Sequence, residues 1–228
     1  MNASPWKGIR LVFCKELTMG LRFKAAWASM FMFALTTLAC VSLALQGGHL
    51  EPKMAAALLW MIIFFASMAG ADRGFADEDA AGTLMVLKLY GSAQPVLFGK
   101  MLYSFFLLAM LVLFIAPLFL ALMGAEIIFP GVFVLTMLLG VAGIAAAGTL
   151  LAALSVGARV KNGLFAVLML PVILPVFLPA VFLTAGALGS GSFSIDYLGG
   201  MALYDGLLAV GASVLFDYLW YEDYTRDR

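Results

Sequence analysis

The 228-residue sequence is poor in charged residues. Only 11% of its residues are Asp, Glu, Lys or Arg, whereas a soluble globular protein carries about 25%. In contrast, 64% of the residues are hydrophobic and the mean hydropathy is +1.08. These proportions indicate a membrane protein. The formal net charge is zero, so the composition gives no reason to expect binding to nucleic acid.

Histidine, cysteine and nucleotide-binding motifs are also scarce or absent from the sequence. Cys14 and Cys40 stand in separate apolar contexts without a CxxC spacing, which argues against a disulfide framework, a zinc site or covalently attached haem. No GxxxxGK[ST] loop is present, so any ATP hydrolysis would reside on another chain. His49 is the only histidine, and we expect it to be solvated in a loop. We therefore predict no catalytic residues and no metal site.

Six apolar segments are each long enough to cross a bilayer, which takes about 20 residues. They run over residues 25–45, 54–71, 101–123, 129–154, 164–188 and 198–220. Every gap between them contains Gly, Pro, Asn or a charged residue, and such residues are typical of loops. We predict an all-α membrane protein with six transmembrane helices, which form a single domain over residues 25–228.

The positions of lysine and arginine predict how these helices are oriented. Segments on one side of the predicted membrane hold 12 of the 13 Lys and Arg residues: five in 1–24, three in 72–100, two in 155–163 and two in 221–228. Only Lys53 lies on the other side. Loops rich in Lys and Arg stay in the cytoplasm. Both termini and residues 72–100 are therefore predicted to be cytoplasmic.

Residues 1–24 are predicted to form an amphipathic helix that lies in the membrane interface. Apolar residues recur at spacings of three and four, and basic residues project from the other side. The apolar stripe consists of Trp6, Ile9, Phe13, Leu17 and Leu21, and the basic residues are Lys7, Lys15 and Arg22. A basic leader ahead of the first span is the alternative.

Small residues fill the fourth predicted span, which contains the run GVAGIAAAG from Gly140 to Gly148. Helices in lipid associate mainly through close packing, and small residues let their backbones approach. We expect this span to pack closely against its neighbours.

The fifth predicted span carries Pro171, Pro175 and Pro179 on nearly one face. Each proline removes an amide donor and leaves one carbonyl of the preceding turn without its helical partner. In a membrane, such carbonyls are tolerated where protein or water satisfies them. We expect this helix to face protein or a cavity and not bulk lipid. The helix would act as a gate if it is broken there, and as a packing helix if it is only kinked.

Asp205 and Asp217 lie within the sixth predicted span. Carboxylates inside a membrane are costly, and they are candidates for function. Both stand near the ends of the predicted segment, however, so we expect them to lie at the two membrane interfaces.

Residues 72–100 form the most polar stretch between spans, with seven of the 26 charged residues of the chain. We expect a short helix in which acidic residues near its start complement the helix dipole. Apolar side chains would offer a surface to a partner, and Gly82 would permit close approach. The acidic residues are Asp77, Glu78 and Asp79, and the apolar ones are Phe75, Leu84 and Leu87. A solvated connecting loop is the alternative.

The pattern F-x-x-E-x-x-x-G-T-L-x-x-L in this stretch resembles the first cytoplasmic loop of ABC exporter permeases. It is followed by Gly99-Lys100, and the chain also has a Lys15-Glu16-Leu17 leader and an LPVILPVFLP fifth span. With the Gly/Ala-rich fourth span and the short basic loop Arg159–Lys161, the whole chain resembles the CcmB family, the haem exporter protein B of cytochrome c maturation. One departure is Met85-Val86, where that family often has an acidic or polar residue.

This resemblance implies a permease subunit of the bacterial inner membrane, and no enzyme. ATP would be hydrolysed by a separate CcmA-type ATPase, to drive release of a haem-loaded CcmE-type chaperone on the periplasmic side. A CcmC-type haem-handling protein, a CcmD-type small membrane protein and a second copy of the chain would be further partners. Haem would be handled by the complex, and no cofactor is assigned to this chain. The resemblance assigns ATPase coupling to Phe75, Asp77, Glu78, Asp79, Gly82, Thr83, Leu84 and Leu87.

Two other functions remain open at this stage. An exporter permease for a lipid, glycan or drug would have the same architecture. A membrane assembly factor without nucleotide coupling is the third possibility. The spans contain no obvious haem ligand, which favours a mechanical role over haem passage.

Overall fold

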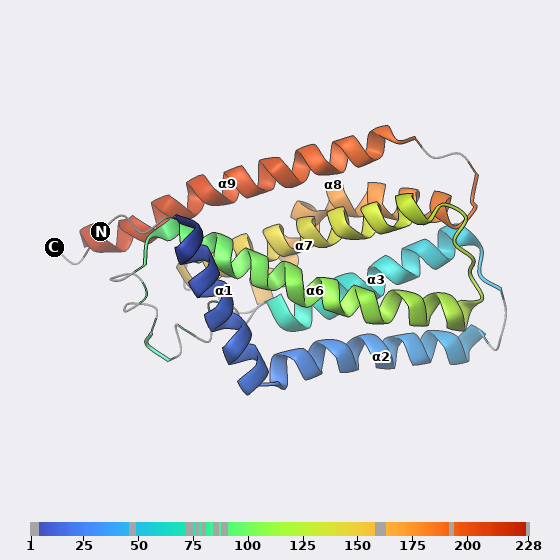
Figure 1. Ribbon diagram of the computed structural model, residues 1–228, viewed down its shortest axis with the longest axis horizontal. Coiled ribbons are helices and arrows are strands. Elements are labelled where there is room, and N and C mark those ends of the chain that lie inside the picture. Colours follow the sequence, from blue (N-terminus) through green and yellow to red (C-terminus); the bar gives the residue numbers. More distant parts are fainter. Residues whose placement is uncertain are drawn as a thin grey trace.

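A computed structural model describes residues 5–45, 49–71, 75, 78, 81–83, 87, 91–157, 163–191 and 194–226. Within these residues the regular structure is entirely helical (Figure 1). The helices are α1 (Pro5–Arg22), α2 (Ala25–Leu45), α3 (Pro52–Ala71), α6 (Ala93–Met123), α7 (Pro130–Gly157), α8 (Gly163–Ala187) and α9 (Asp196–Arg226).

Six of these helices, α2, α3, α6, α7, α8 and α9, are long and apolar enough to cross a membrane. The predicted number of spans is confirmed. The third span starts earlier than predicted, because α6 already begins at Ala93. Ser92 precedes it in extended backbone with φ −78° and ψ 147°. Pro95 lies in the first turn, where backbone amides have no partner within the helix, so it does not interrupt α6.

Helix α7 lies at the centre of the bundle, and 72% of its most apolar stretch is buried, against 17% for α2 and for α9. Its small residues explain this position. A Cβ built at Gly140 would lie 2.1 Å from the ring of Trp60 on α3. The indole of Trp60 donates a hydrogen bond of 2.9 Å to Thr184 Oγ1 on α8. Close packing of the Gly/Ala-rich span is thereby confirmed.

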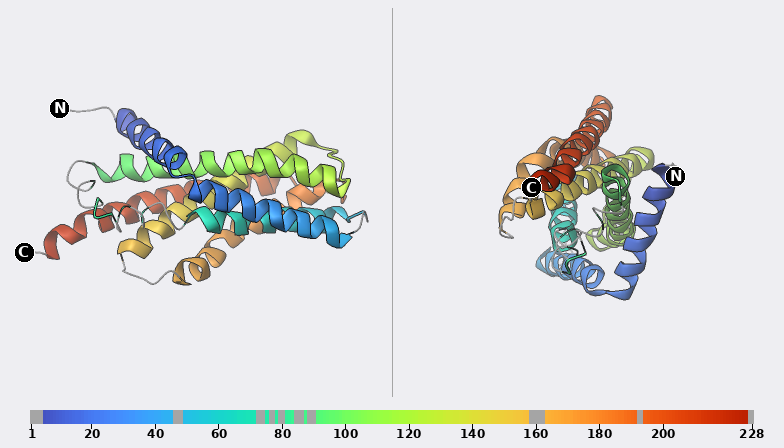
Figure 2. Two further views of the ribbon diagram at one scale, coloured as in Figure 1. Left: turned by 90° about the horizontal axis from the view of Figure 1, so that it is seen from below. Right: turned by 90° about the vertical axis from the view of Figure 1, so that its left-hand side faces the viewer.

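Helix α1 packs across α6 instead of joining the six spans (Figures 1 and 2). Two glycines allow the close crossing. A Cβ at Gly8 would lie 2.9 Å from Pro95, and one at Gly99 would lie 2.6 Å from Val12. The predicted apolar stripe is only partly covered, because Trp6 and Leu21 are 77% and 55% exposed. Binding of α1 to the membrane interface stays a prediction.

One end of the bundle brings together α1, the beginning of α6 and the end of α9 (Figure 1). The described residues between α3 and α6 lie at the same end (Figures 1 and 2). We call this the basal end. It gathers the segments that the sequence assigns to a single side of the membrane.

Helix α8 runs unbroken through all three prolines, so of the two alternatives the broken helix is not observed. Pro171 and Pro175 are exposed on the surface of the chain and Pro179 is half-buried, so a different face of α8 meets protein within the single chain. The buried face consists of bulkier apolar side chains that interlock with the bundle, among them Met169, Ile173, Val176, Ala180 and Leu183.

Candidate functional site

Phe75 anchors the segment that connects α3 to α6. Its side chain is only 2% exposed. The ring lies 5.6 Å from that of Phe216 on α9, centroid to centroid, and 4.6 Å below the ammonium of Lys100 on α6. We expected Phe75 to offer an apolar surface to a partner. Its buried side chain instead holds the segment on the bundle. Leu87 is half-buried against the same core.

Two lysines and two glutamates form a partly buried ion cluster, which we define as Lys15, Glu16, Glu78 and Lys100. Lys100 is 4% exposed, and its Nζ lies 2.8 Å from Glu16 Oε1 and 3.0 Å from Glu78 Oε2. Lys15 donates a hydrogen bond to Glu78 Oε1 and lies 3.2 Å from Glu16 Oε1. The cluster balances its own charge, which is the condition for burying ions. It joins α1, the connecting segment and α6 at one point.

The charges around Lys15 keep it cationic. Burial lowers the pKa of Lys15, but the hydrogen bond to Glu78 and the negative charges of Glu16 and Glu78 outweigh this effect and raise the pKa above its ordinary 10.5. A raised pKa means that the stabilisation is fully present below the ordinary value and is lost only as the pH rises through the raised one. The pairing of Lys15 is therefore insensitive to pH near neutrality.

Gly82 ends one helical turn and exposes a short surface. Its φ is +66°, a conformation that glycine adopts without steric cost. The amide of Thr83 donates a hydrogen bond of 3.0 Å to the carbonyl of Glu78, as in a Schellman C-cap. Glu78 thus lies near the end of a helical turn, and its expected position at a helix start is wrong. No atom lies within 4 Å of a Cβ built at Gly82, and Ala81, Gly82 and Thr83 are exposed.

The end of α9 holds the beginning of α6 through polar contacts. Gln94 Nε2 donates a hydrogen bond of 2.6 Å to Asp217 Oδ2, and Ser213 donates one of 3.0 Å to Gln94 Oε1. The indole of Trp220 donates to the carbonyl of Gly91 at 3.3 Å. Asp217 therefore has a defined partner at the basal end, and its role in this structure is to tie α9 to α6.

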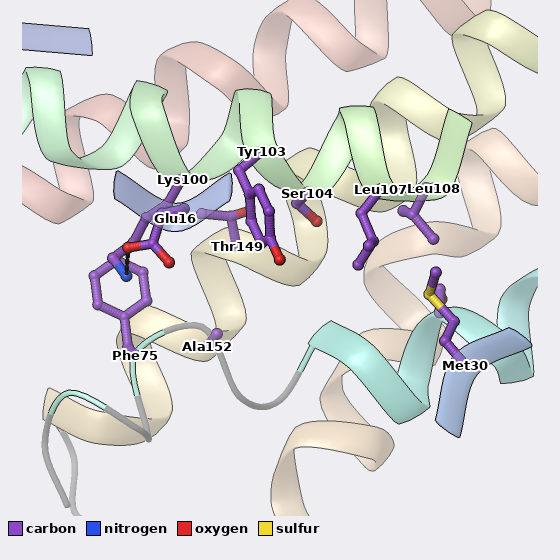
Figure 3. Close-up of a pocket in the computed structure, with 11 residues that line it drawn as sticks. Glu16, Met30, Phe75, Lys100, Tyr103, Ser104, Leu107, Leu108, Thr149 and Ala152 are labelled. Atoms are coloured by element: carbon purple, nitrogen blue, oxygen red, sulfur yellow. Dashed lines mark hydrogen bonds and ion pairs between the residues drawn. The ribbon is translucent and has the colours of Figure 1, made fainter. Parts of the chain in front are cut away.

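A cavity of about 50 Å³ adjoins the ion cluster. Figure 3 shows Lys100 directed towards Glu16 and Phe75, with Tyr103, Ser104 and Thr149 lining the cavity beyond them. Its size suits a few water molecules and is far below the roughly 300 Å³ at which sites for small organic ligands begin. Within the described residues, no group of three or more His, Cys, Asp or Glu could hold a metal ion.

The structure brings together some predicted site residues and adds others. Phe75 and Glu78 meet at the ion cluster, whereas Gly82 and Thr83 face outward. Asp77, Asp79 and Leu84 lie outside the described residues. Sequence reasoning missed Lys15, Glu16 and Lys100 as parts of the site. The available signal was that Lys100 directly precedes an apolar segment and Glu16 belongs to the Lys15-Glu16-Leu17 leader.

Six helices that are long and apolar enough to cross a membrane, with a polar segment fixed to one end of the bundle, fit a multi-pass membrane protein of the transporter permease type. A family model described as CcmB protein matches residues 8–218 of the chain. The chain therefore belongs to the CcmB family, transporter permeases of haem and cytochrome c biogenesis. No curated protein matches the chain.

Proposed function

We propose that this chain is the permease subunit that couples ATP hydrolysis by a separate CcmA-type ATPase to the release of a haem-loaded CcmE-type chaperone on the periplasmic side. One observation carries the proposal. The segment between α3 and α6 is tied through Glu78 to α1 and α6, and through Phe75 to α9. A push on this segment by a partner would therefore move three helices together.

The exposed part of the segment is the proposed docking surface. Ala81, Gly82 and Thr83 face away from the bundle, while the buried residues on either side fix their position. This division supports a surface that is rigid yet accessible, as force transmission requires. Asp77, Asp79 and Leu84 are proposed to complete it, in line with the family resemblance. The excess of Lys and Arg on this side supports a cytoplasmic location, N-in and C-in, in a bacterial inner membrane.

The proposed partners include CcmC-type and CcmD-type membrane proteins, lipid, and a second copy of this chain. The exposed prolines of α8 support the proposal that other proteins pack against this chain. Pro171 and Pro175 are exposed, and the carbonyls of Val167 and Pro171 have no helical amide donor because prolines stand four residues later. In a membrane such carbonyls need protein or water around them. Pro171, Pro175 and Pro179 are proposed as a packing or gating face on this ground.

We propose that this chain acts mechanically on haem transfer and holds no haem itself. The only histidine, His49, lies beside Gly124 at the end opposite to the ion cluster. The chain is proposed to hydrolyse no ATP. Haem would then be carried by the complex, and ATP would be bound by the ATPase subunit.

Co-purification of the ATPase in mild detergent tests the docking surface. Gly82→Trp places bulk on the exposed surface, and Gly82→Ala introduces the same backbone strain without that bulk. We expect Gly82→Trp to reduce the amount of bound ATPase at least about tenfold, the loss of roughly 1.4 kcal/mol of binding free energy. Gly82→Ala should retain most of it. Equal ATPase recovery with both variants and with the wild type would contradict the proposed surface.

Glu78→Lys tests the connection behind that surface. It would place a third cation beside Lys15 and Lys100, and we expect weakened ATPase binding or loss of ATPase stimulation. Glu51→Lys is a matched control, since Glu51 is exposed at the opposite end of the bundle and undergoes the same change in charge. A wild-type level of binding and of stimulated hydrolysis in Glu78→Lys would refute the proposed coupling.

A further inference from the structure

The carboxyl group of Asp205 is buried between helices without a polar partner. Both of its oxygens expose less than 1 Å², and neither has a hydrogen-bond partner among the described residues. Oδ1 lies against α7, where a Cβ built at Gly143 would be only 2.6 Å away. The same Cβ would lie 2.9 Å from both methyl groups of Val176 on α8. Gly143 therefore provides the space that the carboxyl group occupies.

Asp205 lies in the middle of the bundle. The sequence had led us to expect it at a membrane interface. Gly143 is the fourteenth of the 28 residues of α7, and Val176 is the fourteenth of the 25 residues of α8. At about 1.5 Å per residue, Gly143 is roughly 20 Å from either end of α7. The expectation failed because Asp205 is the tenth residue of α9, which begins at Asp196. Nine helical steps cover about 14 Å, which is close to half the roughly 30 Å thickness of a bilayer core.

Within the part of the chain that the structure describes, the helices packed against α9 offer no opposite charge to Asp205. Helices α7 and α8 contain no charged or titratable residue. On α6, Lys100 pairs with Glu16 and Glu78, and Tyr103 accepts a hydrogen bond from Trp27. On α9, the hydroxyl of Tyr204 donates a bond of 2.7 Å to the carbonyl of Val172, and Asp217 is held by Gln94.

An ionised carboxylate at this depth would be very unfavourable, whereas a neutral carboxyl group costs much less to bury. We propose that Asp205 is a proton-binding site of the membrane interior. The carboxyl group holds a proton while α7, α8 and α9 are packed around it, and it releases that proton to water when the contact at Gly143 opens. Because the packed state binds one proton more than the opened state, a rise in pH favours opening. Opening of the contact between α7 and α9 is therefore linked to proton release. This linkage is independent of the coupling to the ATPase proposed above.

Thermal unfolding of the full chain in lipid nanodiscs, at about pH 6 and about pH 8.5, tests this site. Asp205→Asn replaces the protonated acid with a neutral group of the same shape. We expect the variant to match the wild type within about 2 °C at the lower pH, and to be the more stable one by about 3 °C or more at the higher pH. Asp217→Asn is the control, because Asp217 accepts a bond from Gln94, and it should be less stable than the wild type at both values.

Two results would overturn the proposal. If Asp205→Asn is clearly less stable than the wild type at both pH values, the carboxylate is ionised and has a partner in the membrane. If the difference between the two proteins does not change with pH, no proton is bound or released at Asp205.

Chemical labelling with two carbodiimides locates the proton. A hydrophobic carbodiimide, which reacts with protonated carboxyl groups, should modify Asp205 several-fold more at about pH 6 than at about pH 8.5. A water-soluble carbodiimide should modify the exposed Asp196 and leave Asp205 unmodified. Equal modification of Asp205 by both reagents, as at Asp196, would show a hydrated surface acid and contradict the proposal.

Discussion

The acids of the ion cluster at the basal end and the buried acid in the middle of the bundle are neutralised in different ways. Glu16 and Glu78 face two lysines in the ion cluster, whereas Asp205 has no polar partner among the described residues. The lysines come from α1 and α6, so neutralisation at the basal end also joins separate elements. In the middle of the bundle, the proposed proton neutralises Asp205 without connecting it to another element. The first site suits transmission of force, and the second suits a response to pH.

Glycine makes room at both sites, but for different neighbours. Gly99 lets α1 approach α6 so that Glu16 reaches Lys100, and Gly143 accommodates the carboxyl group of Asp205. A single methyl group would therefore disturb the approach of helices in one case and the position of a carboxyl group in the other. Variants at the two sites should behave differently.

The largest expected effect comes from Lys100→Met. It would leave Glu16 and Glu78 buried with only the half-exposed Lys15 as a partner, and removing one member of a buried pair costs about 3–5 kcal/mol. Thermal unfolding of the full chain in lipid should show a strong loss of stability. Lys100→Arg keeps the charge and should be much milder. The exposed Lys53→Met serves as the control, and an effect of Lys100→Met no larger than this control would contradict the role of the cluster.

Gly143→Ala should have an intermediate effect. Its Cβ would clash with Asp205 Oδ1 and with Val176, and overpacking of this kind costs about 1–3 kcal/mol. Gly211→Ala is the control on α9, because a Cβ there meets nothing within 4 Å, and it should stabilise the helix by about 0.5–1 kcal/mol. Unfolding temperatures that move in the same direction for both variants would refute the packing described at Gly143.

Tyr204→Phe should have the smallest effect of the three. It removes the hydrogen bond to Val172 on the proline-containing part of α8, which contributes about 1 kcal/mol. The loss should be additive with Lys100→Met, since the two sites share no contact, and non-additive with Gly143→Ala, which perturbs the neighbouring residue. Double-variant cycles measured by thermal unfolding check both statements.

The spans could be predicted from the sequence because length and hydropathy are properties of a single segment. The face that each helix buries could not. Helices α7 and α8 are apolar on all sides, so periodicity does not distinguish a buried stripe from an exposed one. For this reason the outward position of Pro171 and Pro175 was not foreseen.

The ion cluster could be predicted only in part. The family pattern pointed to Phe75 and Glu78, but their partners lie far away in sequence. Lys100 is 84 residues from Glu16 and Lys15 is 63 residues from Glu78. A single sequence gives no signal for pairing at such separations, so Glu78 was expected to face a partner protein and Glu16 was assigned no place in the site. The depth of Asp205 likewise depends on how α7, α8 and α9 pack.

The most direct test of the mechanical coupling is chaperone release by the reconstituted complex with Glu78→Gln. This substitution preserves the shape of the side chain and removes the charge that joins α1, the connecting segment and α6. With the ATPase still bound, we predict that the amount of haem-loaded chaperone released per ATP hydrolysed falls about tenfold or more. Unchanged release per ATP, with the assembled complex intact, would show that the ion cluster does not transmit the action of the ATPase.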